Sequence, residues 1–442
     1  MRRYEFKEGT SNKFWEIELE GESFTTRYGK IGTDGQETTK DFDSAAEARK
    51  AYDKLILEKE KKGYVLVSGG EGTAAAATSN PELEAMILAR PEDPEGYLVY
   101  GDWLQAHGDP RGQLIAVQAA LLKKPDDEKL KRQEKDLLTE HQADFLGELP
   151  ELAEFDEDVA LTWRLGFLRD VSIGGEEYSD IDAEGACRIL FGLASAKFLR
   201  SLSILVFGTE DGNPDYGPLI KALAKLDLPP TLRSLKFSVE DFQISWSDLG
   251  DLAPLYPKLA RLEELAIKMG KMDLGDMKLP GLVSLEIITG GLTKANLRSV
   301  AKASWPRLEK LVLYFGTEEY GGDCGAGDLA ALLEGKNLGQ LRHLGLSNAE
   351  FADELAAAVP AAKILGQLHT LDLSKGAMTD EGANALLAQA EALKHLKRLD
   401  LSQNYLSDEV AARLVAALTS TEVDVDDQGD PNEEYRYVQV AE

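Results

Sequence analysis

Paired carboxylates in the second half of the chain are the residues whose type and spacing best suit chemistry. Asp372 and Asp400 each lie between two leucines in the sequence Leu-Asp-Leu, in two copies of one recurring pattern. Carboxylates stacked on neighbouring strands could share acid–base work. That work needs a pocket that holds a substrate, and an open sheet offers none. We therefore interpret the two aspartates as part of an acidic recognition stripe.

Three histidines recur at even spacing. His343, His369 and His395 are separated by equal steps, which would place them on successive structural units. His343 stands immediately before a leucine of the repeated pattern, whereas His369 stands two positions before one. Side chains alternate between the two faces of a strand, so these two rings should point in opposite directions. A metal pair is not expected, because both ligands must reach the same ion.

The chain contains no other constellation that predicts catalysis. It lacks a Gly-x-x-x-x-Gly-Lys phosphate loop, zinc-ligand spacing, a His-Glu-x-x-His motif and a Gly-x-Ser-x-Gly elbow. A polar cluster at Asp102, Trp103, His107, Asp109 and Arg111 could be imagined as an active site. In the simpler interpretation the two aspartates cap helices, Trp103 lies in a core and Arg111 forms a local ion pair. We predict no enzyme activity, no cofactor and no metal.

The elements that carry the aspartates repeat one short pattern, Leu-x-x-Leu-x-Leu or a close aliphatic variant. Its second anchor recurs nine times at a mean spacing of about 28 residues, which gives each unit room for a strand and a helix. The nine anchors are Val171, Leu202, Leu235, Leu265, Leu285, Leu311, Leu344, Leu371 and Leu399. The step from Leu265 to Leu285 is the shortest of these, so an irregularity is expected there.

The alternation Leu-x-Leu predicts a half-buried strand, and the apolar spacing after it predicts a helix. In the last copy, Asp408 and Glu409 occupy the first turn expected for that helix. Such units stack their strands into one parallel sheet with helices outside. The region from about residue 168 to 425 resembles the leucine-rich repeat family of the ribonuclease-inhibitor type, in which Asn404 would bond backbone groups after the strand. Residues 148–425 are therefore expected to form a solenoid with an amino-terminal cap and a concave parallel sheet.

Solvent-facing strand positions define the predicted binding surface on the concave face. These positions are Ile288, Val312, Tyr314, Asp372, Arg398 and Asp400. The first three give an apolar and aromatic middle, and the charged residues flank it, as in protein-binding hot spots with a polar rim. Val312 and Tyr314 are the expected anchors, and the acidic stripe favours a basic protein partner. In an alternative interpretation, the early assignments are shifted by one residue and belong to the buried core.

The net charge of -29 limits the partners of the chain as a whole, because such a field repels nucleic acid and acidic membranes. Residues 1–67 are the exception, with 13 basic and 14 acidic residues. A hydrophobic content of 43% excludes a disordered protein, and no apolar run suits a membrane span or a signal peptide. Two distant cysteines, Cys187 and Cys324, exclude a disulfide framework and indicate a reduced, cytoplasmic setting.

Residues 1–67 alternate apolar and polar residues in short runs, which predict antiparallel strands followed by one helix. The order Trp15, Arg27-Tyr28-Gly29-Lys30, Gly35-Gln36 and a lysine-rich helix end resembles the WGR domain of DNA-dependent poly(ADP-ribose) polymerases and of bacterial regulators. In those polymerases a Trp-Gly-Arg triplet packs an aromatic ring and a basic side chain against the DNA backbone. The resemblance implies these roles for Tyr28, Gly29 and Lys30, with Arg27 beside them. Otherwise these are surface positions of a protein-binding or structural domain.

The segments between residues 1–67, which we call the head, and the repeats are expected to be a linker and a helical module. Residues 68–80 contain glycines and an alanine run without amphipathic pattern, which predicts a flexible linker. Residues 81–147 contain repeated Asp-Pro helix starts. Within them, Leu98 to Leu104 and Gly108 to Ile115 resemble the repeat-companion domain, a helical module found beside repeat arrays in bacterial proteins. Residues 426–442 are acidic and suit the terminal cap that a solenoid requires.

The sequence therefore predicts a multidomain α/β protein of bacterial origin and leaves two functions open. In the first, it is a noncatalytic adaptor that binds a protein on the concave face. In the alternative, it binds DNA ends or nicks through the WGR-like head, while the solenoid recruits an effector. Neither function involves a membrane.

Overall fold

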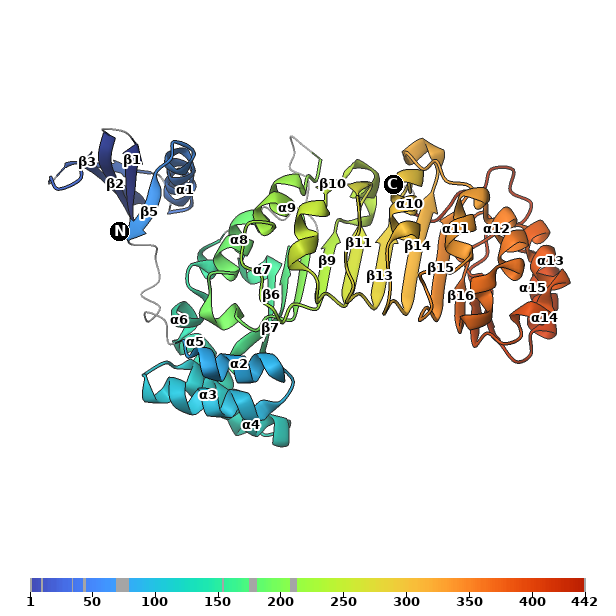
Figure 1. The fold of residues 1–442 in the computed structure, drawn as a ribbon, viewed down its shortest axis with the longest axis horizontal. Coiled ribbons are helices and arrows are strands. Elements are labelled where there is room, and N and C mark those ends of the chain that lie inside the picture. Colours follow the sequence, from blue (N-terminus) through green and yellow to red (C-terminus); the bar gives the residue numbers. More distant parts are fainter. Residues whose placement is uncertain are drawn as a thin grey trace. The chain divides into compact units, whose positions relative to one another are not determined.

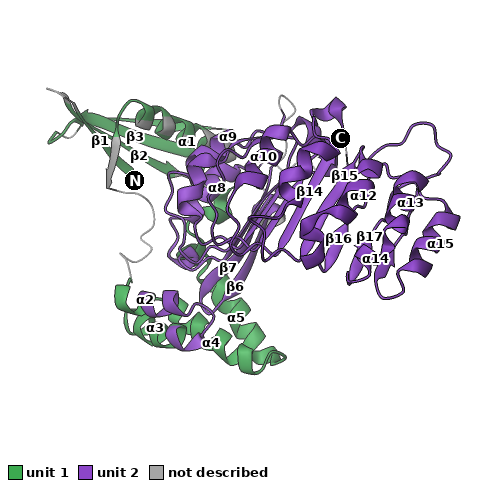
Figure 2. Cartoon of the chain, turned by 45° about the vertical axis from the view of Figure 1, so that its right-hand side comes forward, with its two compact units in different colours: residues 1–84, 97–153 green, residues 85–96, 154–442 purple. Residues whose placement is uncertain are grey.

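The structure is a computed structural model of the 442-residue chain, which divides into two compact units (Figure 2). One unit consists of residues 1–84 and 97–153, and the other of residues 85–96 and 154–442. The described residues are 2–8, 11–33, 35–42, 45–68, 79–152, 155–174, 181–206 and 213–440. Most of the predicted linker, residues 69–78, lies outside the described residues.

The amino-terminal part contains the predicted small antiparallel sheet, with strand order β4-β3-β2-β1-β5. Its strands are β1 Arg2–Glu8, β2 Ser11–Glu20, β3 Ser23–Lys30, β4 Gln36–Asp41 and β5 Val65–Ser68. Helix α1, Ala45–Lys61, contributes Tyr52 and Ile56 to a core with Tyr4 and Trp15. Alternate residues of each strand point to this helix, and the other side chains lie on the opposite side of the sheet.

Short helices follow this sheet, and the first three begin at or just after the Pro-containing signals in the sequence. They are α2 Pro81–Ala89, α3 Pro94–Ala106, α4 Arg111–Lys123, α5 Glu128–Glu140 and α6 Gln142–Leu146. Asp109 and Arg111 are both buried and form the predicted local ion pair, with Arg111 Nε 3.0 Å from Asp109 Oδ1. The prediction that Asp102 caps a helix is wrong. Asp102 is exposed within α3, because that helix continues unbroken to Ala106.

The second unit is built on an eleven-stranded sheet with the order β18-β17-β16-β15-β14-β13-β11-β9-β8-β7-β6 (Figure 1). Its strands are β6 Val159–Arg164, β7 Phe167–Ile173, β8 Ser201–Leu205, β9 Ser234–Ser238, β11 Glu264–Lys268, β13 Ser284–Ile288, β14 Lys310–Gly316, β15 His343–Ala349, β16 Thr370–Asp372, β17 Arg398–Asp400 and β18 Glu422–Asp424. The strands from β7 to β18 pair in parallel, whereas β6 pairs with β7 in antiparallel fashion. The sheet is therefore mixed rather than purely parallel as predicted, because the turn at residues 165–166 forms a hairpin at its edge.

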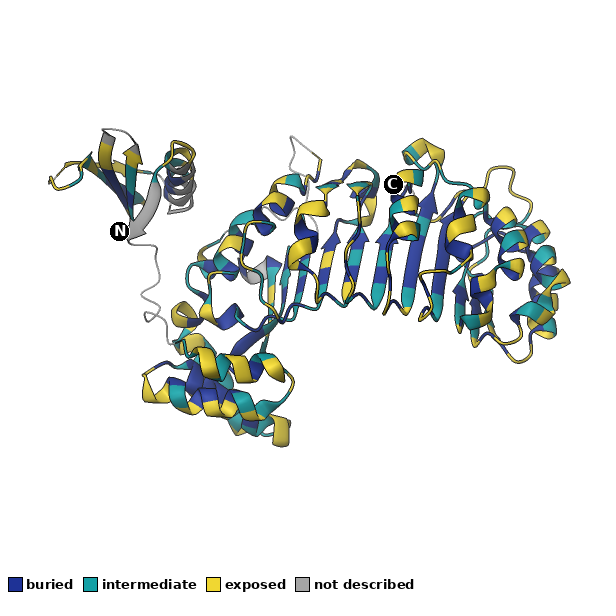
Figure 3. Ribbon diagram, viewed as in Figure 1, coloured by how far each residue is buried: buried dark blue, intermediate teal, exposed yellow. Residues whose placement is uncertain are grey.

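The repeated anchors form one continuous row across this sheet. Each of the nine predicted anchors, from Val171 to Leu399, is the register partner of the next, and Val423 of β18 extends the row. All nine are at most 2% exposed. Figure 3 shows buried and half-buried residues along the strands and most exposed residues on the helices and loops. The anchor row therefore lies on the face of the sheet that the connecting segments cover.

Helices connect most of the successive parallel strands. They are α8 Ala183–Leu190, α9 Gly217–Leu223, α10 Lys294–Lys302, α11 Ala330–Leu333, α12 Ala352–Ala358, α13 Asp380–Ala388, α14 Ala390–Leu393 and α15 Asp408–Ala417, and a short α7, Phe155–Asp158, precedes β6. Right-handed crossovers place such helices on one side of a parallel sheet. The predicted irregularity occurs between β11 and β13, where the short step has no α-helix. Its strand β12, Lys271–Asp273, pairs instead with β10, Asp248–Asp251.

Asn404 holds the turn after β17, as the resemblance to leucine-rich repeats implies. Asn404 is fully buried, and its Nδ2 donates to the carbonyl oxygens of Leu373 and Leu401 at 3.0 Å each. Its Oδ1 accepts from the backbone N–H of Met378 at 3.1 Å. One side chain thus joins the turns of two neighbouring repeats.

The carboxyl-terminal segment returns along the ends of β17, β16 and β15. Tyr405 Oη donates to the carbonyl of Tyr437 at 2.9 Å, and Gln439 N–H donates to the carbonyl of Lys375. Asn348 then makes two bonds with the backbone of Val440: its Oδ1 accepts at 2.8 Å and its Nδ2 donates at 2.5 Å. The segment predicted to be an acidic cap is thus attached to three repeats.

Candidate functional site

The four residues predicted to bind nucleic acid lie at the end of β3, on alternate faces of the amino-terminal sheet. Tyr28 is the register partner of Trp15, so it shares the face on which α1 packs, and Lys30 lies on the same face. Arg27 and Gly29 belong to the opposite face. Tyr28 is 44% exposed and Lys30 is also exposed, so these two can meet a ligand together.

Further lysines join Tyr28 and Lys30 on the α1 side. Lys13 is the register partner of Lys30, and both are exposed. The Nζ of Lys59, near the end of α1, lies 5.1 Å from the ring centroid of Trp15 and 5.3 Å from that of Tyr64. We call Lys13, Tyr28, Lys30, Lys59 and Tyr64 the basic–aromatic surface. Lys13 and Lys59 were not predicted from the sequence, although the alternation of strand residues puts Lys13 on the same face as Lys30.

The lysines of the basic–aromatic surface repel one another. Burial lowers the pKa of Lys59, and the charges of Lys62 and Lys13 lower it further, against the charge of Glu58. Like charges directly opposite each other on neighbouring strands are destabilising. A phosphate group bound here would relieve that repulsion, and aromatic rings beside it could stack on a sugar or base.

Arg27 has a partner within the domain. Its Nε lies 2.6 Å from Oε2 of Glu16, and Arg3 Nη1 lies 2.7 Å from Oε1 of the same carboxylate. Glu16 is only 2% exposed. Burial raises the pKa of Glu16, but the bonds from Arg27 and Arg3 and their charges outweigh it, so the pKa is lower than usual. Arg27 therefore neutralises an internal carboxylate on the face away from α1.

Gly29 is required by internal packing. A Cβ at this position would lie 2.9 Å from the Cα of Gly35 and 3.2 Å from Cε1 of Phe14. Gly35 itself has a φ of +74° and approaches the Phe14 ring. The glycine thus allows the loop after β3 to close over Phe14, which is 1% exposed.

The second candidate surface is the face of the large sheet opposite the anchor row, which we call the open face. Its side chains alternate with the anchors, at the positions one before, one after and three after each anchor. All six residues of the predicted surface occupy such positions, so the assignments are not shifted by one residue. Ile288, Tyr314, Asp372, Arg398 and Asp400 are half-buried.

Val312 differs from the other five because it is only 5% exposed. Its register partner on β15 is Gly345, and a Cβ on that glycine would lie 3.1 Å from both Val312 methyl groups. Val312 therefore leans over the space that a side chain at position 345 would fill. It lies on the predicted face but offers little surface to a partner.

Tyr314 lies among carboxylates. Burial raises the pKa of its hydroxyl, and the charges of Asp372, Glu286, Asp400 and Asp241 raise it further. Asp372 is two strands away, yet its charge has the largest effect of the four. A positive group near Tyr314 would meet several negative charges and one aromatic ring.

Arg398 shows how a cation is held on the open face. Its Nη2 donates to Oδ2 of Asp400 at 3.0 Å and to Oδ2 of Asp424 at 2.6 Å, and its Nη1 donates to Oε1 of Glu422 at 2.5 Å. Burial raises the pKa of Asp400, but hydrogen bonds from Ser402 and Arg398 lower it below its usual value. One guanidinium therefore bridges three acidic side chains.

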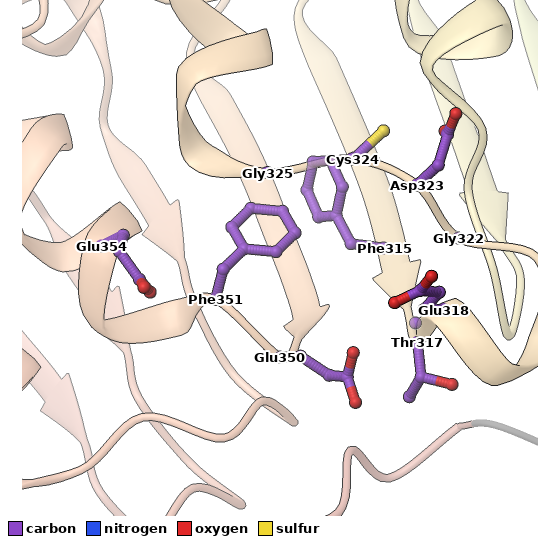
Figure 4. Close-up of a pocket in the computed structure, with 11 residues that line it drawn as sticks. Phe315, Thr317, Glu318, Gly322, Asp323, Cys324, Gly325, Glu350, Phe351 and Glu354 are labelled. Carbon is purple, nitrogen blue, oxygen red and sulfur yellow. The ribbon is translucent and has the colours of Figure 1, made fainter.

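A cavity of about 450 Å³ lies beyond the ends of β14 and β15 (Figure 4). The ring centroids of Phe315 and Phe351 are 5.2 Å apart in its wall, at an interplanar angle of 70°. Burial raises the pKa of the Cys324 thiol to about 12, with a further effect of nearby aspartates. The remaining lining is acidic or glycine-rich, so the cavity suits neither a phosphate nor a thiolate nucleophile. Its lining residues are Phe315, Gly316, Thr317, Glu318, Gly322, Asp323, Cys324, Gly325, Glu350, Phe351 and Glu354.

Two exposed aromatic residues escaped the sequence analysis. Phe242 is 50% exposed and Trp246 is 57% exposed, on the 3-10 helix Asp241–Trp246 after β9. Asp241 pairs with Lys268 of the open face. Because this helix lies between repeats, the repeat pattern carries no signal for it. The available clue in the sequence was that Phe242 and Trp246 lie outside the alternating pattern of the strands.

Within the described parts of the chain, no group of three or more His, Cys, Asp or Glu residues could hold a metal ion. Cys187 is buried, Cys324 is half-buried, and both are free thiols. None of the helices in the described ranges is both long and apolar enough to cross a membrane.

Comparison with known proteins identifies the head. Residues 1–71 match the model of the WGR domain family. Two Escherichia coli proteins match the same region: the uncharacterized protein YfeS is 44% identical over 63 residues, and protein YehF is 46% identical over 65 residues. These matches cover 14% and 15% of this chain, and about a quarter of each relative, 26% and 24%.

Solved structures match a larger part of the chain. A protein of Bacteroides fragilis is 26% identical, and the match covers 99% of this chain and 98% of that one with a TM-score of 0.49. An internalin of Listeria monocytogenes is 16% identical, and the match covers 59% of this chain and 87% of that one with a TM-score of 0.22.

At the amino terminus, the family match, the two relatives and the antiparallel sheet agree: this part of the chain is a WGR domain.

Proposed function

We propose that the protein is a noncatalytic adaptor that binds a protein partner on the open face of its large sheet. The observation that carries the proposal is the environment of Tyr314, a half-buried aromatic residue whose hydroxyl lies in the field of four carboxylates. Aromatic side chains within a polar surround are frequent hot spots of protein interfaces. Ile288, in the neighbouring strand, adds apolar surface next to it.

The proposal also assigns the helical part and the repeated part of the chain to known families. We infer that residues 148–425 form a leucine-rich-repeat solenoid of the ribonuclease-inhibitor type, with the open face as its concave surface. The in-register row of anchors and the side-chain bonds of Asn404 support this. Residues 81–147 would then be its repeat-companion module. Two free cysteines are consistent with a reduced, cytoplasmic setting.

The partner should be basic where it meets the carboxyl-terminal repeats. The open face of these repeats carries four acidic residues and the positive charge of Arg398. The acidic residues are Asp372, Asp400, Glu422 and Asp424. Electrostatic complementarity of this kind selects partners and speeds association.

A cross-linking experiment tests the adaptor function. A photoreactive phenylalanine analogue at position 314 of the full chain would capture the partner in cells, and calorimetry with the purified partner would follow. Tyr314→Ala should weaken binding about tenfold or more, as for a hot-spot residue. Val415→Ala is the matched control, because it removes an exposed apolar side chain from α15. Unchanged affinity of a correctly folded Tyr314→Ala protein would remove the open face from consideration.

A second function, binding of DNA ends or nicks through the WGR domain, is favoured by the basic–aromatic surface. Lys13 and Lys30 lie on the same face as exposed Tyr28, Lys59 lies over the ring of Trp15, and a phosphate would relieve the repulsion that Lys62 and Lys13 exert on Lys59. In this function the open face would recruit an effector.

Fluorescence polarisation of the full chain with nicked, blunt-ended and uninterrupted duplexes, over a salt series, tests the second function. Lys30→Ala and Lys59→Ala should each weaken binding and reduce its salt dependence. Lys40→Ala is the control, because Lys40 also lies over an aromatic ring, that of Phe42 at 4.7 Å, but on β4. No binding at low salt, or equal losses in all three variants, would contradict a nucleic-acid role for this surface.

A further inference from the structure

A row of charged residues follows the edge of the large sheet at which the parallel strands begin. Arg169, Arg200 and Arg233 each lie two residues before the anchor of one of three successive repeats. The N–H of Arg200 donates to the carbonyl of Arg169, and the N–H of Arg233 donates to the carbonyl of Arg200, at 2.8 Å each. Glu263 takes the same position in the fourth repeat, and its N–H donates to the carbonyl of Arg233 at 2.7 Å. Three arginines and one glutamate are therefore neighbours along this edge.

The loop between α2 and α3 is bound to this edge by its acidic residue. Glu92 accepts from two arginines of the row, with Oε2 3.0 Å from Arg169 Nη1 and Oε1 3.1 Å from Arg200 Nη1. Arg164 holds the backbone of the same loop, because it donates to the carbonyls of Pro91 and Glu92 at 3.2 and 2.8 Å. The chain itself thus shows how this edge receives an acidic peptide segment.

Glu263 repeats this arrangement one step further along the edge. Its Oε2 lies 3.3 Å from Arg200 Nη2, and its Oε1 lies 3.6 Å from Arg233 Nε. Burial has the largest effect on the pKa of Arg233 and lowers it, whereas the charge of Glu263 raises it. The charges of Arg200, Arg261 and Arg307 lower that pKa further. Three arginine charges thus act on Arg233 against the charge of Glu263.

Arg261 and Arg307 are accessible at this edge and have no carboxylate between them. Both are exposed, and neither forms an ion pair with any of the described residues. Exposed Glu309 lies two residues after Arg307 and pairs with neither arginine. The two arginines lie four residues before the anchors of β11 and β14, and Gly281 takes this position in the repeat between them. They are therefore two strands apart, roughly 10 Å, a gap that two arginine side chains can close around one carboxylate.

We propose that this edge binds an acidic segment of a protein partner and holds one of its carboxylates between Arg261 and Arg307. The bound carboxylate would extend the row by one step, because Glu92 and Glu263 each lie between two arginines in the same way. A guanidinium matches the geometry of a carboxylate, since its planar donors can reach both oxygens. An acidic peptide is favoured over nucleic acid, because the loop that already binds here offers one carboxylate and two backbone carbonyls. The inference goes beyond the proposed function, since this edge precedes the strands and is separate from the open face.

Fluorescence polarisation of fluorescein-labelled hexaglutamate with the full chain, at low ionic strength, tests the inference, with hexaglutamine as the uncharged comparison. The net charge of -29 repels hexaglutamate, so its binding cannot reflect general attraction to the chain. Arg261→Gln and Arg307→Gln should each weaken its binding about threefold to fivefold, the effect of one exposed ion pair. The double variant should weaken it about tenfold or more. Arg413→Gln removes an exposed arginine from α15 and should change affinity less than about twofold.

Glu309→Gln provides an independent check, because it leaves both arginines in place and should strengthen hexaglutamate binding. Urea midpoints of all variants should equal that of the wild type, since the replaced side chains are exposed. No binding of hexaglutamate, or equal losses in Arg413→Gln and the two edge variants, would overturn the inference. So would loss of binding in Lys30→Ala, because the probe would then be on the basic–aromatic surface. If a six-nucleotide oligothymidylate binds instead and the double variant weakens it, this edge takes phosphate and the acidic-peptide proposal fails.

Discussion

Replacing Arg27 by alanine tests whether this side chain stabilises the WGR domain from within. In the structure Arg27 and Arg3 each donate to one oxygen of Glu16, at 2.6 and 2.7 Å, and the Glu16 side chain is only 3% exposed. In Arg27→Ala the carboxylate stays buried but loses the donor to Oε2. The fold must then carry a partly unpaired charge.

The magnitude follows from exposure and from the remaining partner. A hydrogen bond to a charged group contributes about 1.5–3 kcal/mol, and removing one partner of a fully buried ion pair costs about 3–5 kcal/mol. The lower range applies, because the Arg27 side chain is 38% exposed and Arg3 keeps its bond. We therefore expect the free energy of unfolding of the domain to fall by about 2 kcal/mol, within the range for one charged hydrogen bond.

Hydrogen–deuterium exchange reports on this domain within the full chain. A loss of about 2 kcal/mol should accelerate exchange of the protected amides of β2 and β3 about 30-fold. The double variant Glu16→Gln, Arg27→Ala should recover part of the loss, since it also removes the buried charge. Lys40→Ala, an exposed residue of the same sheet, should leave exchange unchanged. Unaltered exchange in Arg27→Ala would refute the structural role and return Arg27 to the candidates for ligand binding.

Three further predictions concern stability. Because the pKa of Glu16 is lowered in the fold, its ion pairs stabilise the domain fully above the ordinary glutamate pKa, and this contribution is lost as the pH falls through the lower folded value. Urea midpoints of Glu16→Gln should therefore depend less on acid pH than those of the wild type. Asn404→Ala leaves the N–H of buried Met378 unpaired, so it should reduce the free energy of unfolding by about 2–4 kcal/mol. Exposed Asn384→Ala is the control and should reduce it by less than about 0.5 kcal/mol. Urea denaturation measures both values. Asn348→Ala should accelerate amide exchange in the last residues, up to position 440, because it removes both bonds between Asn348 and the backbone of Val440.

The parts of the fold that sequence predicted are those set by alternation and repetition. A leucine every second residue defines which side of a strand is buried, and nine copies of the pattern define which residues become neighbours. The row from Val171 to Leu399 and the face assigned to Tyr314 follow from these two periods alone. The role of Asn404 in the turn after β17 came instead from the resemblance to leucine-rich repeats, and its bonds are found there.

Features that depend on contacts between different strands were beyond that reasoning. Alternation places Val312 on the open face. It does not reveal that Gly345, on the neighbouring strand β15, leaves space for the Val312 side chain, which is therefore buried and offers little surface to a partner. Alternation also could not show that Arg27 has an internal partner whereas Tyr28 is exposed. The strand register that puts Glu16 opposite Arg27 must be known first. The antiparallel β6 and the 3-10 helix with Trp246 lie outside the repeat, so no period describes them.

The two candidate surfaces carry opposite charge, and this makes their functions separable in a single protein. At physiological ionic strength the field of a charge decays over about 8 Å, so the charge of -29 spread over the whole chain cannot determine what binds at one surface. Lys59→Ala should therefore weaken only the binding of duplex DNA, and Asp372→Asn should weaken only the binding of the protein partner. If either variant changed both affinities in opposite directions, net charge rather than local geometry would govern binding, and neither surface would qualify as a site.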